Sequence, residues 1–385
     1  DRLASIVYSS GTTGTPKGAM LTFGCFGYVG EQVRDNFRLR KPERFFSYLP
    51  LSHIAERALM EMVALSSGST ISFAESLDTF QENLRNTQPT IFGGVPRIFT
   101  KFRDGILEKI PQRTLDRLLA VPGVNILLRR MLLKKLGLLK ARVVVCGAAP
   151  TAVPLLTWFN KLGLEIREAY GMTENTAYSH CNFRLVRNGT VGQPWPGVDV
   201  QLDPTGEVLI RHAALMTGYY KDPNTTKKVF TENGFLKTGD LGAVDAQGFL
   251  TITGRAKDQF KTEKAKFVAP APIELKLSAN ACIDQVCVVG TGLPQPMALV
   301  TLSPAGRSKP QEMIEIEIAR TIENTNMALE KHEHIKAAVI LQENWNIENG
   351  FMTPSLKIKR NVVEKHYQSR FIEWFSVGAP VVWER

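Results

Sequence analysis

The sequence contains no run of about 18 uncharged apolar residues, so no membrane-spanning helix is expected. Its five cysteines are scattered, odd in number and free of Cys-x-x-Cys spacing, which argues against a disulfide framework and against a metal cluster. The first residues, Asp1-Arg2-Leu3, lead directly into an expected strand, and no secretory signal peptide is expected. A reducing, cytoplasmic compartment fits these features best.

Acidic residues are outnumbered, and the excess of positive charge is concentrated in one segment. The 385 residues carry 47 Lys/Arg and 37 Asp/Glu, for a net charge of +10, and the segment from Arg97 to Arg142 alone contributes +9. Such a segment can serve an anionic membrane surface, nucleic acid or a polyphosphate substrate, or it can be a solvated helical face. Phe99 and Phe102 are its only aromatic residues, so it lacks the stacking residues typical of nucleic-acid binding.

The chain is long enough for two or three domains, and its first half has the pattern of an α/β domain. In residues 1–190, short apolar strands alternate with segments of helical apolar spacing, such as 23–35 and 54–65. This alternation predicts a mostly parallel sheet covered by helices, with ligands outside the carboxyl ends of the strands. The expected strands are 6–8, 45–49, 70–73, 90–92, 143–146 and 165–169.

The rest of the chain has a different pattern of apolar and turn-forming residues. Residues 191–254 are rich in turns and in alternating strands, which predicts a small β-rich subdomain. Residues 259–385 have the pattern of a smaller α+β domain, and residues 255–258 connect the two. The elements expected here are strands 198–202, 207–211, 285–290 and 297–302 and a helix over 313–329.

The most distinctive string is Tyr8-Ser9-Ser10-Gly11-Thr12-Thr13-Gly14-Thr15-Pro16-Lys17-Gly18, directly after an expected strand. Its glycines let the backbone turn tightly with converging N–H groups, its hydroxyls add donors, and its lysine adds a compact positive charge. Together these groups predict a pocket for phosphate oxygens. No Gly-Lys-Ser/Thr closes the string, so it is not a Walker motif.

Two strings carry a family resemblance. The glycine-rich string resembles, nearly letter for letter, the phosphate loop of the adenylate-forming enzymes, which include acyl-CoA synthetases, luciferases and the adenylation domains of peptide synthetases. Tyr170-Gly171-Met172-Thr173-Glu174 is similar to their Tyr-Gly-x-Thr-Glu signature. The resemblance implies a large α/β domain with a β subdomain, a small mobile C-terminal α+β domain, and ATP, Mg²⁺ and coenzyme A as ligands.

The resemblance also implies a nucleotide site drawn from several motifs. The small side chains after strand 143–146 would let adenine approach the backbone, and Tyr170 would stack on the base. Thr12 and Glu174 would hold Mg²⁺, and Asp240 would accept the ribose hydroxyls. The implied nucleotide-binding residues are Ser9, Ser10, Gly11, Thr12, Thr13, Gly14, Thr15, Lys17, Gly147, Ala148, Ala149, Tyr170, Gly171, Thr173, Asp240 and Arg255.

The catalytic group that the resemblance implies is Lys357, with Thr173 and Glu174 in supporting roles. Pro354-Ser355-Leu356-Lys357 is similar to the Pro-Ser/Thr-x-Lys string of the family, which selects Lys357 over Lys359. Its compact charge would bridge the acid's carboxylate and the α-phosphate as negative charge develops. The Gly-Arg-x-Lys-Asp string makes Lys257 the expected hinge between the domains.

The long-chain fatty acid–CoA ligases are the subgroup that the chain resembles most. The string Leu49-Pro50-Leu51-Ser52-His53-Ile54-Ala55-Glu56-Arg57 is similar to one that borders their acyl pocket, so His53 is an acyl-substrate candidate and Ser52 the expected helix cap. Val95-Pro96-Arg97 matches the same subgroup. Residues 126–140 pair apolar residues with cations, which predicts a helix with one apolar and one basic face. That helix could cover the core, border an acyl tunnel or lie peripherally on the inner membrane face.

Two departures keep other readings open. Lys264 and Ala265 stand where the family usually has glycines near the pantetheine of coenzyme A, so another acceptor or a β-lactone product is an alternative to thioester formation. Family members also carry a long stretch ahead of the phosphate loop. A non-catalytic fragment that binds nucleotide or a membrane is therefore the second alternative.

Overall fold

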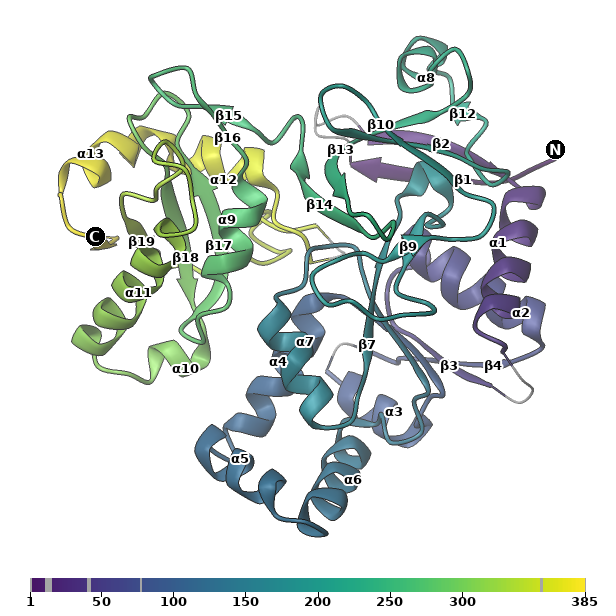
Figure 1. The fold of residues 1–385 in the computed structure, drawn as a ribbon, viewed down its shortest axis with the longest axis horizontal. Coiled ribbons are helices and arrows are strands. Elements are labelled where there is room, and N and C mark those ends of the chain that lie inside the picture. The colour runs from purple at the N-terminus through teal and green to yellow at the C-terminus, as the bar shows by residue number, and fades with distance from the viewer. Residues whose placement is uncertain (1, 11–15, 40–42, 77, 354–355, 385) are drawn as a thin grey trace. The chain divides into compact units, whose positions relative to one another are not determined.

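The computed structural model describes residues 2–10, 16–39, 43–76, 78–353 and 356–384. The chain divides into two compact units, Asp1–Thr238 with Gly242–Ile252, and Gly239–Leu241 with Thr253–Arg385. Figure 1 labels most of the elements of both. None of the described helices is both long enough and apolar enough to cross a membrane.

The first unit is built on a seven-stranded sheet of order β4-β3-β5-β6-β7-β8-β9. The strands from β4 to β7 are parallel to their neighbours, and β8 and β9 are added antiparallel. The predicted α/β class and the mostly parallel sheet are confirmed. The strands are β3 (Arg44–Ser47), β4 (Thr70–Phe73), β5 (Ile91–Gly94), β6 (Val143–Cys146), β7 (Ile166–Tyr170), β8 (His180–Cys181) and β9 (Gln193–Pro194).

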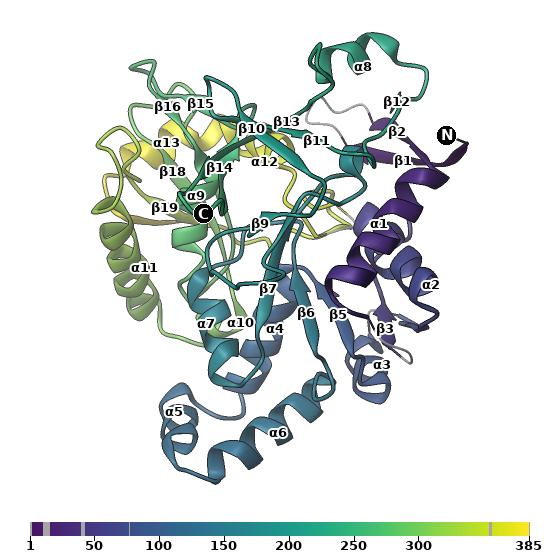
Figure 2. The same cartoon turned by 45° about the vertical axis from the view of Figure 1, so that its right-hand side comes forward.

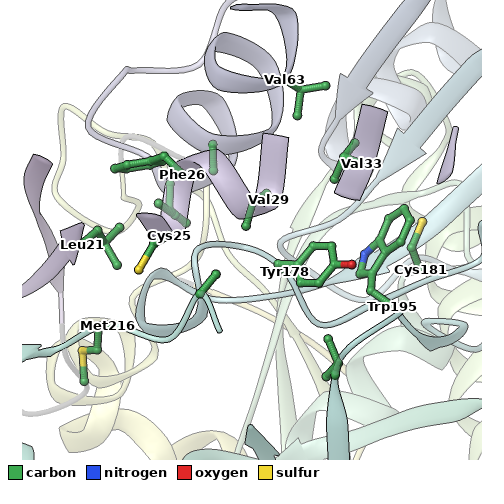
Figure 3. Packing of buried hydrophobic residues seen from close by; sticks show 14 of the residues in the cluster. Leu21, Cys25, Phe26, Val29, Val33, Val63, Tyr178, Cys181, Trp195 and Met216 are labelled. Carbon is green, nitrogen blue, oxygen red and sulfur yellow. The ribbon is translucent and has the colours of Figure 1, made fainter. Parts of the chain in front are cut away.

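Helices cover both faces of this sheet because successive strand residues point to opposite sides. Phe45 and Ile91 belong to the core beneath α1, and the next residues along the strands, Phe46 and Phe92, belong to the core on the other face. Figure 3 shows the first of these cores, in which α1 packs toward Trp195. One face carries α1 (Phe23–Asn36), η1 (Ala55–Met62) and α2 (Val63–Ser67); the other carries α3 (Phe80–Thr87), α4 (Pro96–Leu107), α5 (Gln112–Ala120), α6 (Val124–Leu136) and α7 (Val153–Lys161).

The strand before the phosphate loop does not belong to the parallel sheet, which corrects the sequence-based expectation for residues 6–8. β1 (Leu3–Ser10) pairs antiparallel with β2 (Pro16–Thr22), and β12 (Gly218–Tyr219) joins the other edge of β2. Pro16 to Gly18 were expected to be loop because of their composition, yet they begin a strand. Gly18 lies opposite Tyr8, where a Cβ atom would come within 2.7 Å of Ile6.

A third sheet, of order β10-β11-β13-β14, follows in the region that was expected to be rich in β-structure. Its strands 207–211 and 199–202 match the expected positions closely. The elements of this region are η2 (Thr173–Asn175), β10 (Asp199–Leu202), β11 (Glu207–Arg211), α8 (Pro223–Val229), β13 (Leu236–Val244) and β14 (Leu250–Arg255).

The second unit is a four-stranded sheet, β17-β18-β19-β20, with helices on both faces. Val286 and Val288 of β17 belong to one core with α9 and α11, whereas Cys287 and Val289 belong to another with α12 and α13. The expected α+β class is confirmed. The elements are β15 (Phe260–Lys261), β16 (Phe267–Val268), α9 (Pro270–Leu277), β17 (Ile283–Val289), β18 (Met297–Leu302), α10 (Pro304–Arg307), α11 (Gln311–Asn326), β19 (Ala338–Ile340), α12 (Arg360–Tyr367), η3 (Gln368–Arg370), α13 (Phe371–Ser376) and β20 (Val381–Trp383).

Candidate active site

Two of the predicted motifs meet at one edge of the parallel sheet. β6 and β7 are neighbours with Cys146 opposite Glu168, and Gly147 and Tyr170 come at the ends of these two strands. The N–H of Gly147 donates to the carbonyl of Gly94 at 3.2 Å, which places the start of the small-residue loop. Ala148 adopts a positive φ of 69° in this loop. The loop and the Tyr170 segment therefore lie side by side, as the sheet topology predicts for a ligand site.

The turn after Tyr170 depends on a glycine. A Cβ atom at Gly171 would lie 2.5 Å from the carbonyl carbon of Ala177, so no other residue fits this backbone approach. The N–H of Met172 then donates to the Asn175 side chain at 2.8 Å and begins η2, which carries Thr173 and Glu174. This short 3₁₀ helix fixes the two side chains that the family resemblance singles out.

A chain of contacts connects the phosphate-loop lysine to Glu174. The hydroxyl of Tyr219 donates to Oε1 of Glu174 at 2.7 Å, and Nζ of Lys17 lies 5.6 Å from the centre of the Tyr219 ring. Tyr219 is paired with Ala19 of β2, so the strand beside the phosphate loop also positions this tyrosine. Burial raises the pKa of the Tyr219 hydroxyl, and the neighbouring Glu174 adds to the effect, so the hydroxyl stays a donor.

No role for Tyr219 was expected from the sequence. It stands in the string Gly218-Tyr219-Tyr220, and the local sequence does not indicate which of the two tyrosines is buried. In the structure Tyr219 is buried and Tyr220 is exposed.

Glu174 is the one predicted Mg²⁺ ligand that the structure describes. Gly11, Thr12, Thr13, Gly14 and Thr15 lie outside the described residues, as does the Ser10 side chain. Among the residues that are described, no group of three His, Cys, Asp or Glu side chains could hold a metal ion. A single buried carboxylate fits Mg²⁺, which usually takes one or two protein carboxylates and completes its shell with phosphate oxygens and water.

The His53 segment forms a π-helix that buries an acid. Ser52 does not cap the helix as expected; η1 begins at Ala55 without a side-chain cap, and the N–H of Ala55 donates to Nδ1 of His53 at 3.2 Å. Glu56 is buried, and desolvation raises its pKa to about 7 against the opposing effect of a hydrogen bond with Ser47. Sequence reasoning saw Glu56 only as part of a helix start. π-helical turns are frequent at functional sites, which keeps His53 a candidate.

The second unit brings three predicted residues together. Nε of Arg255 donates to Oδ1 of Asp240 at 2.9 Å, and Asp240 is buried. Desolvation lowers the pKa of Lys357 to about 8; Arg255 acts in the same direction, and Asp240 opposes both. The Lys357 side chain nevertheless has ample access to solvent, so water screens part of these interactions. The turn is closed by the N–H of Thr353, which donates to the Lys357 carbonyl at 2.8 Å.

A partly buried guanidinium, that of Arg360, anchors the segment that follows Lys357. Nη2 of Arg360 lies 2.6 Å from Oε1 of Glu274, and Nη1 donates to the Val288 carbonyl at 2.7 Å. The same Glu274 oxygen accepts from the N–H of Val288 at 2.6 Å. Arg360 also lies in the electrostatic field of Asp258, one residue after the expected hinge. Sequence analysis missed this anchor, because a cation in a lysine-rich string gives no sign of burial.

The expected hinge, Lys257, and the position where the family usually has glycine lie close together in the chain. Lys257 is exposed in the turn between β14 and β15. Ala265 adopts a φ of +56°, a left-handed conformation that favours glycine, and its N–H donates to the Thr262 carbonyl at 2.9 Å. The backbone therefore takes a glycine-like conformation although the residue is alanine.

Known proteins match most of the chain. The family described as AMP-binding enzyme matches residues 1–220, and the family described as AMP-binding enzyme C-terminal domain matches residues 257–376. The long-chain-fatty-acid–CoA ligase FadD15 of Mycobacterium tuberculosis is 33% identical over 95% of this chain and 68% of its own length. Long-chain-fatty-acid–CoA ligase 5 of Rattus norvegicus is 30% identical over 96% of this chain and 61% of its own.

Solved structures agree with this fold. The A domain of the carboxylic acid reductase from Segniliparus rugosus, in complex with AMP and a carboxylic acid, superposes with a TM-score of 0.76 at 24% identity, over 97% of this chain and 61% of its own. ATP-bound MatB from Rhodopseudomonas palustris superposes with a TM-score of 0.75 at 25% identity, over 96% of this chain and 69% of its own. The chain thus spans roughly two thirds of the length of these proteins.

Proposed function

The chain belongs to the AMP-binding enzyme family, and from that premise we propose that it activates a long-chain fatty acid with Mg·ATP and transfers the acyl group to coenzyme A. The acid and the acceptor are suggested by relatives named as long-chain-fatty-acid–CoA ligases at 30% and 33% identity. The His53 segment supports a fatty acid, because a π-helix whose Ala58 and Met60 belong to the apolar core on the α1 face of the sheet can border an apolar chain. Each buried methylene adds about 0.8 kcal/mol, which favours long chains.

The first step of the proposed reaction forms the acyl-adenylate. A carboxylate oxygen of the acid attacks the α-phosphorus of ATP, the bond to the bridging oxygen breaks, and pyrophosphate leaves. Lys17 and the phosphate loop hold the phosphates. Glu174 would hold Mg²⁺, which would neutralise charge on the leaving group when bound. Lys357 stabilises the negative charge that develops around the α-phosphate.

The second step transfers the acyl group. The thiol sulfur of coenzyme A attacks the acyl carbon, the carbon–oxygen bond to AMP breaks, the thiol proton is released, and AMP leaves. We propose that the second unit reorients about Lys257 between the two steps, since hinges need only a few residues that tolerate a backbone rotation. The glycine-like φ of Ala265 supports coenzyme A as the acceptor, because the alanine does not prevent the backbone conformation expected there.

The nucleotide site proposed here keeps every residue that the family resemblance implied. Tyr219 is added to that set because it carries the hydrogen bond to Glu174. Five free cysteines, all buried, support a reducing compartment such as the cytoplasm.

The observation that carries the proposal is the contact chain Lys17, Tyr219 and Glu174, since it joins the phosphate loop to the second family signature through a residue of a third segment. If the two motifs resembled those of the family only by chance, their residues would not be expected to lie close together in the structure.

The test is pyrophosphate release from Mg·ATP with octanoate, palmitate and oleate, each with and without coenzyme A. Release that requires palmitate or oleate and continues only with coenzyme A is the expected result. Sustained release without coenzyme A would favour another acceptor or a lactone product. Absence of release with every acid would overturn the proposal for this chain.

A further inference from the structure

The helical pair α5–α6 forms an end of the first unit that the proposed reaction does not use. In both ribbon views it lies at the end of this unit opposite the hairpin β1–β2 (Figures 1 and 2). One side of α6 packs on the core through Leu128, Leu132 and Leu136, which recur every fourth residue. This side accounts for the helix's attachment to the fold.

The exposed side of α6 is also apolar at its start. Leu127 is 72% exposed and Ile126 is 59% exposed, and Met131 follows one turn later. Val121 and Val124, at the turn between α5 and α6, are exposed as well. Sequence analysis predicted one apolar and one basic face; instead the buried face takes only part of the apolar residues, and the rest lie among cations. We call this surface, Val121, Val124, Ile126, Leu127 and Met131 with the flanking cations, the α5–α6 tip.

Exposed cations surround these apolar side chains. Asp116 is the only acidic residue between Gln112 and Lys140, and it is already paired with Lys161 at 3.2 Å. This stretch of the sequence is therefore strongly positive. The exposed cations of the pair and its flank are Arg113, Arg117, Arg130, Lys134, Lys135 and Lys140.

This combination fits the surface of a lipid bilayer better than it fits water. Clustered apolar side chains in water are unfavourable, and they gain free energy when they enter the boundary between headgroups and acyl chains. Lysine and arginine beside them gain from anionic headgroups. No aromatic residue occurs from Gln112 to Lys140, so the stacking that single-stranded nucleic acid requires is lacking.

We propose that the α5–α6 tip binds peripherally to the surface of an anionic lipid bilayer. Leu127, Ile126 and the two valines enter the headgroup boundary, and Arg130, Lys134 and Lys135 contact the lipid phosphates. The proposal stands independently of the enzymatic activity, since it rests on exposure and charge alone.

The experiment is flotation of the purified chain with vesicles of phosphatidylcholine, and with vesicles in which part of that lipid is replaced by phosphatidylglycerol. Binding to the anionic vesicles that weakens as salt is raised is the expected result. The variant Arg130→Gln/Lys134→Gln/Lys135→Gln should lower the partition coefficient about fivefold per cation removed. The variant Ile126→Gln/Leu127→Gln should lower it about tenfold.

Two matched control variants distinguish binding through the α5–α6 tip from non-specific adsorption to vesicles. Lys227→Gln/Lys228→Gln removes exposed cations from α8, and Ile372→Gln removes an apolar side chain that is 76% exposed in the second unit. Both should float as the wild type does. A second readout, the fluorescence of Leu127→Trp, should shift to the blue with anionic vesicles only, because the indole leaves water.

Three outcomes would overturn the proposal. One is the absence of flotation with anionic vesicles. Another is flotation that the α8 variant loses and the tip variants keep. The third is concentration-dependent self-association abolished by Ile126→Gln/Leu127→Gln without any vesicle binding, which would assign the tip to a second copy of the chain. Since all the substituted side chains are exposed, unchanged thermal unfolding is expected in every variant.

Discussion

Lys17 and Lys357 each stand in a motif string, one in each compact unit, and their surroundings differ. Lys17 is the second residue of the antiparallel strand β2 and lies over the ring of Tyr219, whose hydroxyl donates a hydrogen bond to Glu174. Lys357 lies in a solvent-accessible turn beside Asp240 and Arg255, and its pKa is lowered to about 8. Lys17 is fixed by sheet pairing and ring contact, whereas the pKa of Lys357 is lowered chiefly by desolvation.

This difference suits the two roles proposed for them. A group that holds phosphates contributes before and during the reaction, so a rigid position in a strand is appropriate. A group that stabilises charge only as it develops contributes mainly in the transition state. Substitutions around Lys17 are therefore expected to affect the binding of ATP, and substitutions of Lys357 are expected to affect mainly the rate of the chemical step.

The largest effect is expected from Lys357→Ala. Removing the donor from the developing charge should lower the rate of pyrophosphate release by a factor on the order of 10²–10³ while ATP still binds. Lys359→Ala, two residues away, is the matched control and should stay within about twofold of the wild type. Equal losses in both variants, measured in the pyrophosphate assay, would remove Lys357 from the catalytic role.

Next in size is the loss of the anchor behind Lys357. Arg360→Met removes the ion-pair partner of Glu274. Because the two side chains are only 19% and 17% exposed, water compensates little for this loss, and the free energy of unfolding should fall by about 3 kcal/mol. Lys309→Met breaks the more exposed Lys309–Glu317 pair and should cost less than about 1 kcal/mol. Urea unfolding measures both. Similar values for the two variants would mean that Arg360 is not an anchor.

Tyr219→Phe tests whether the hydrogen bond from Tyr219 positions Glu174 in the surroundings of Lys17. It keeps the ring beneath Lys17 and removes the hydrogen bond to Glu174, a bond to a charged group worth about 1.5–3 kcal/mol. We expect kcat/KM for Mg·ATP to fall by about 10- to 100-fold. Tyr220→Phe alters the neighbouring exposed tyrosine and should have no effect. An unchanged kcat/KM in Tyr219→Phe would show that Glu174 needs no positioning.

The pH dependence of kcat/KM tests the lowered pKa of Lys357. Because its pKa is lowered to about 8, the amine loses its proton as the pH rises through that value, and kcat/KM should fall about tenfold per pH unit above it. In Lys357→Arg the guanidinium stays charged, so whatever activity remains should lack this alkaline limb. The same limb in both proteins would assign the ionisation to another group.

The smallest effect is expected from Ala265→Gly. Glycine adopts the positive φ of this position without steric cost, so the free energy of unfolding should rise by about 0.5 kcal/mol. Ala246→Gly, in an exposed turn without a positive φ, should lower it by a similar amount. A loss of stability in Ala265→Gly, measured by thermal unfolding, would contradict the proposed strain.

Much of the fold could be predicted because it is local. Strands such as Val143–Cys146 and Met297–Leu302 are short apolar runs bounded by turn residues, and the structure has them with the expected bounds. β2 was missed because Pro16-Lys17-Gly18 has the composition of a loop, and only the pairing with β1 makes it a strand.

The residues of the candidate site could be predicted where a motif is contiguous, and not where the site is assembled from distant segments. Gly147, Tyr170 and Glu174 follow from strings of a few residues. Tyr219 reaches Glu174 only because β12 pairs with β2, about two hundred residues earlier in the chain, and no local pattern encodes that pairing. Arg360 was missed for the same reason, since its partner Glu274 lies on another helix.

The most direct test of the proposed chemistry is a single-turnover experiment with palmitate and Mg·ATP, in which the products are identified by mass spectrometry before and after coenzyme A is added. We expect palmitoyl-AMP on the protein first, followed by its conversion to palmitoyl-CoA with release of AMP. Palmitoyl-AMP that persists after the addition of coenzyme A, or the absence of any adenylate, would contradict the assignment of this chain as a fatty acid–CoA ligase.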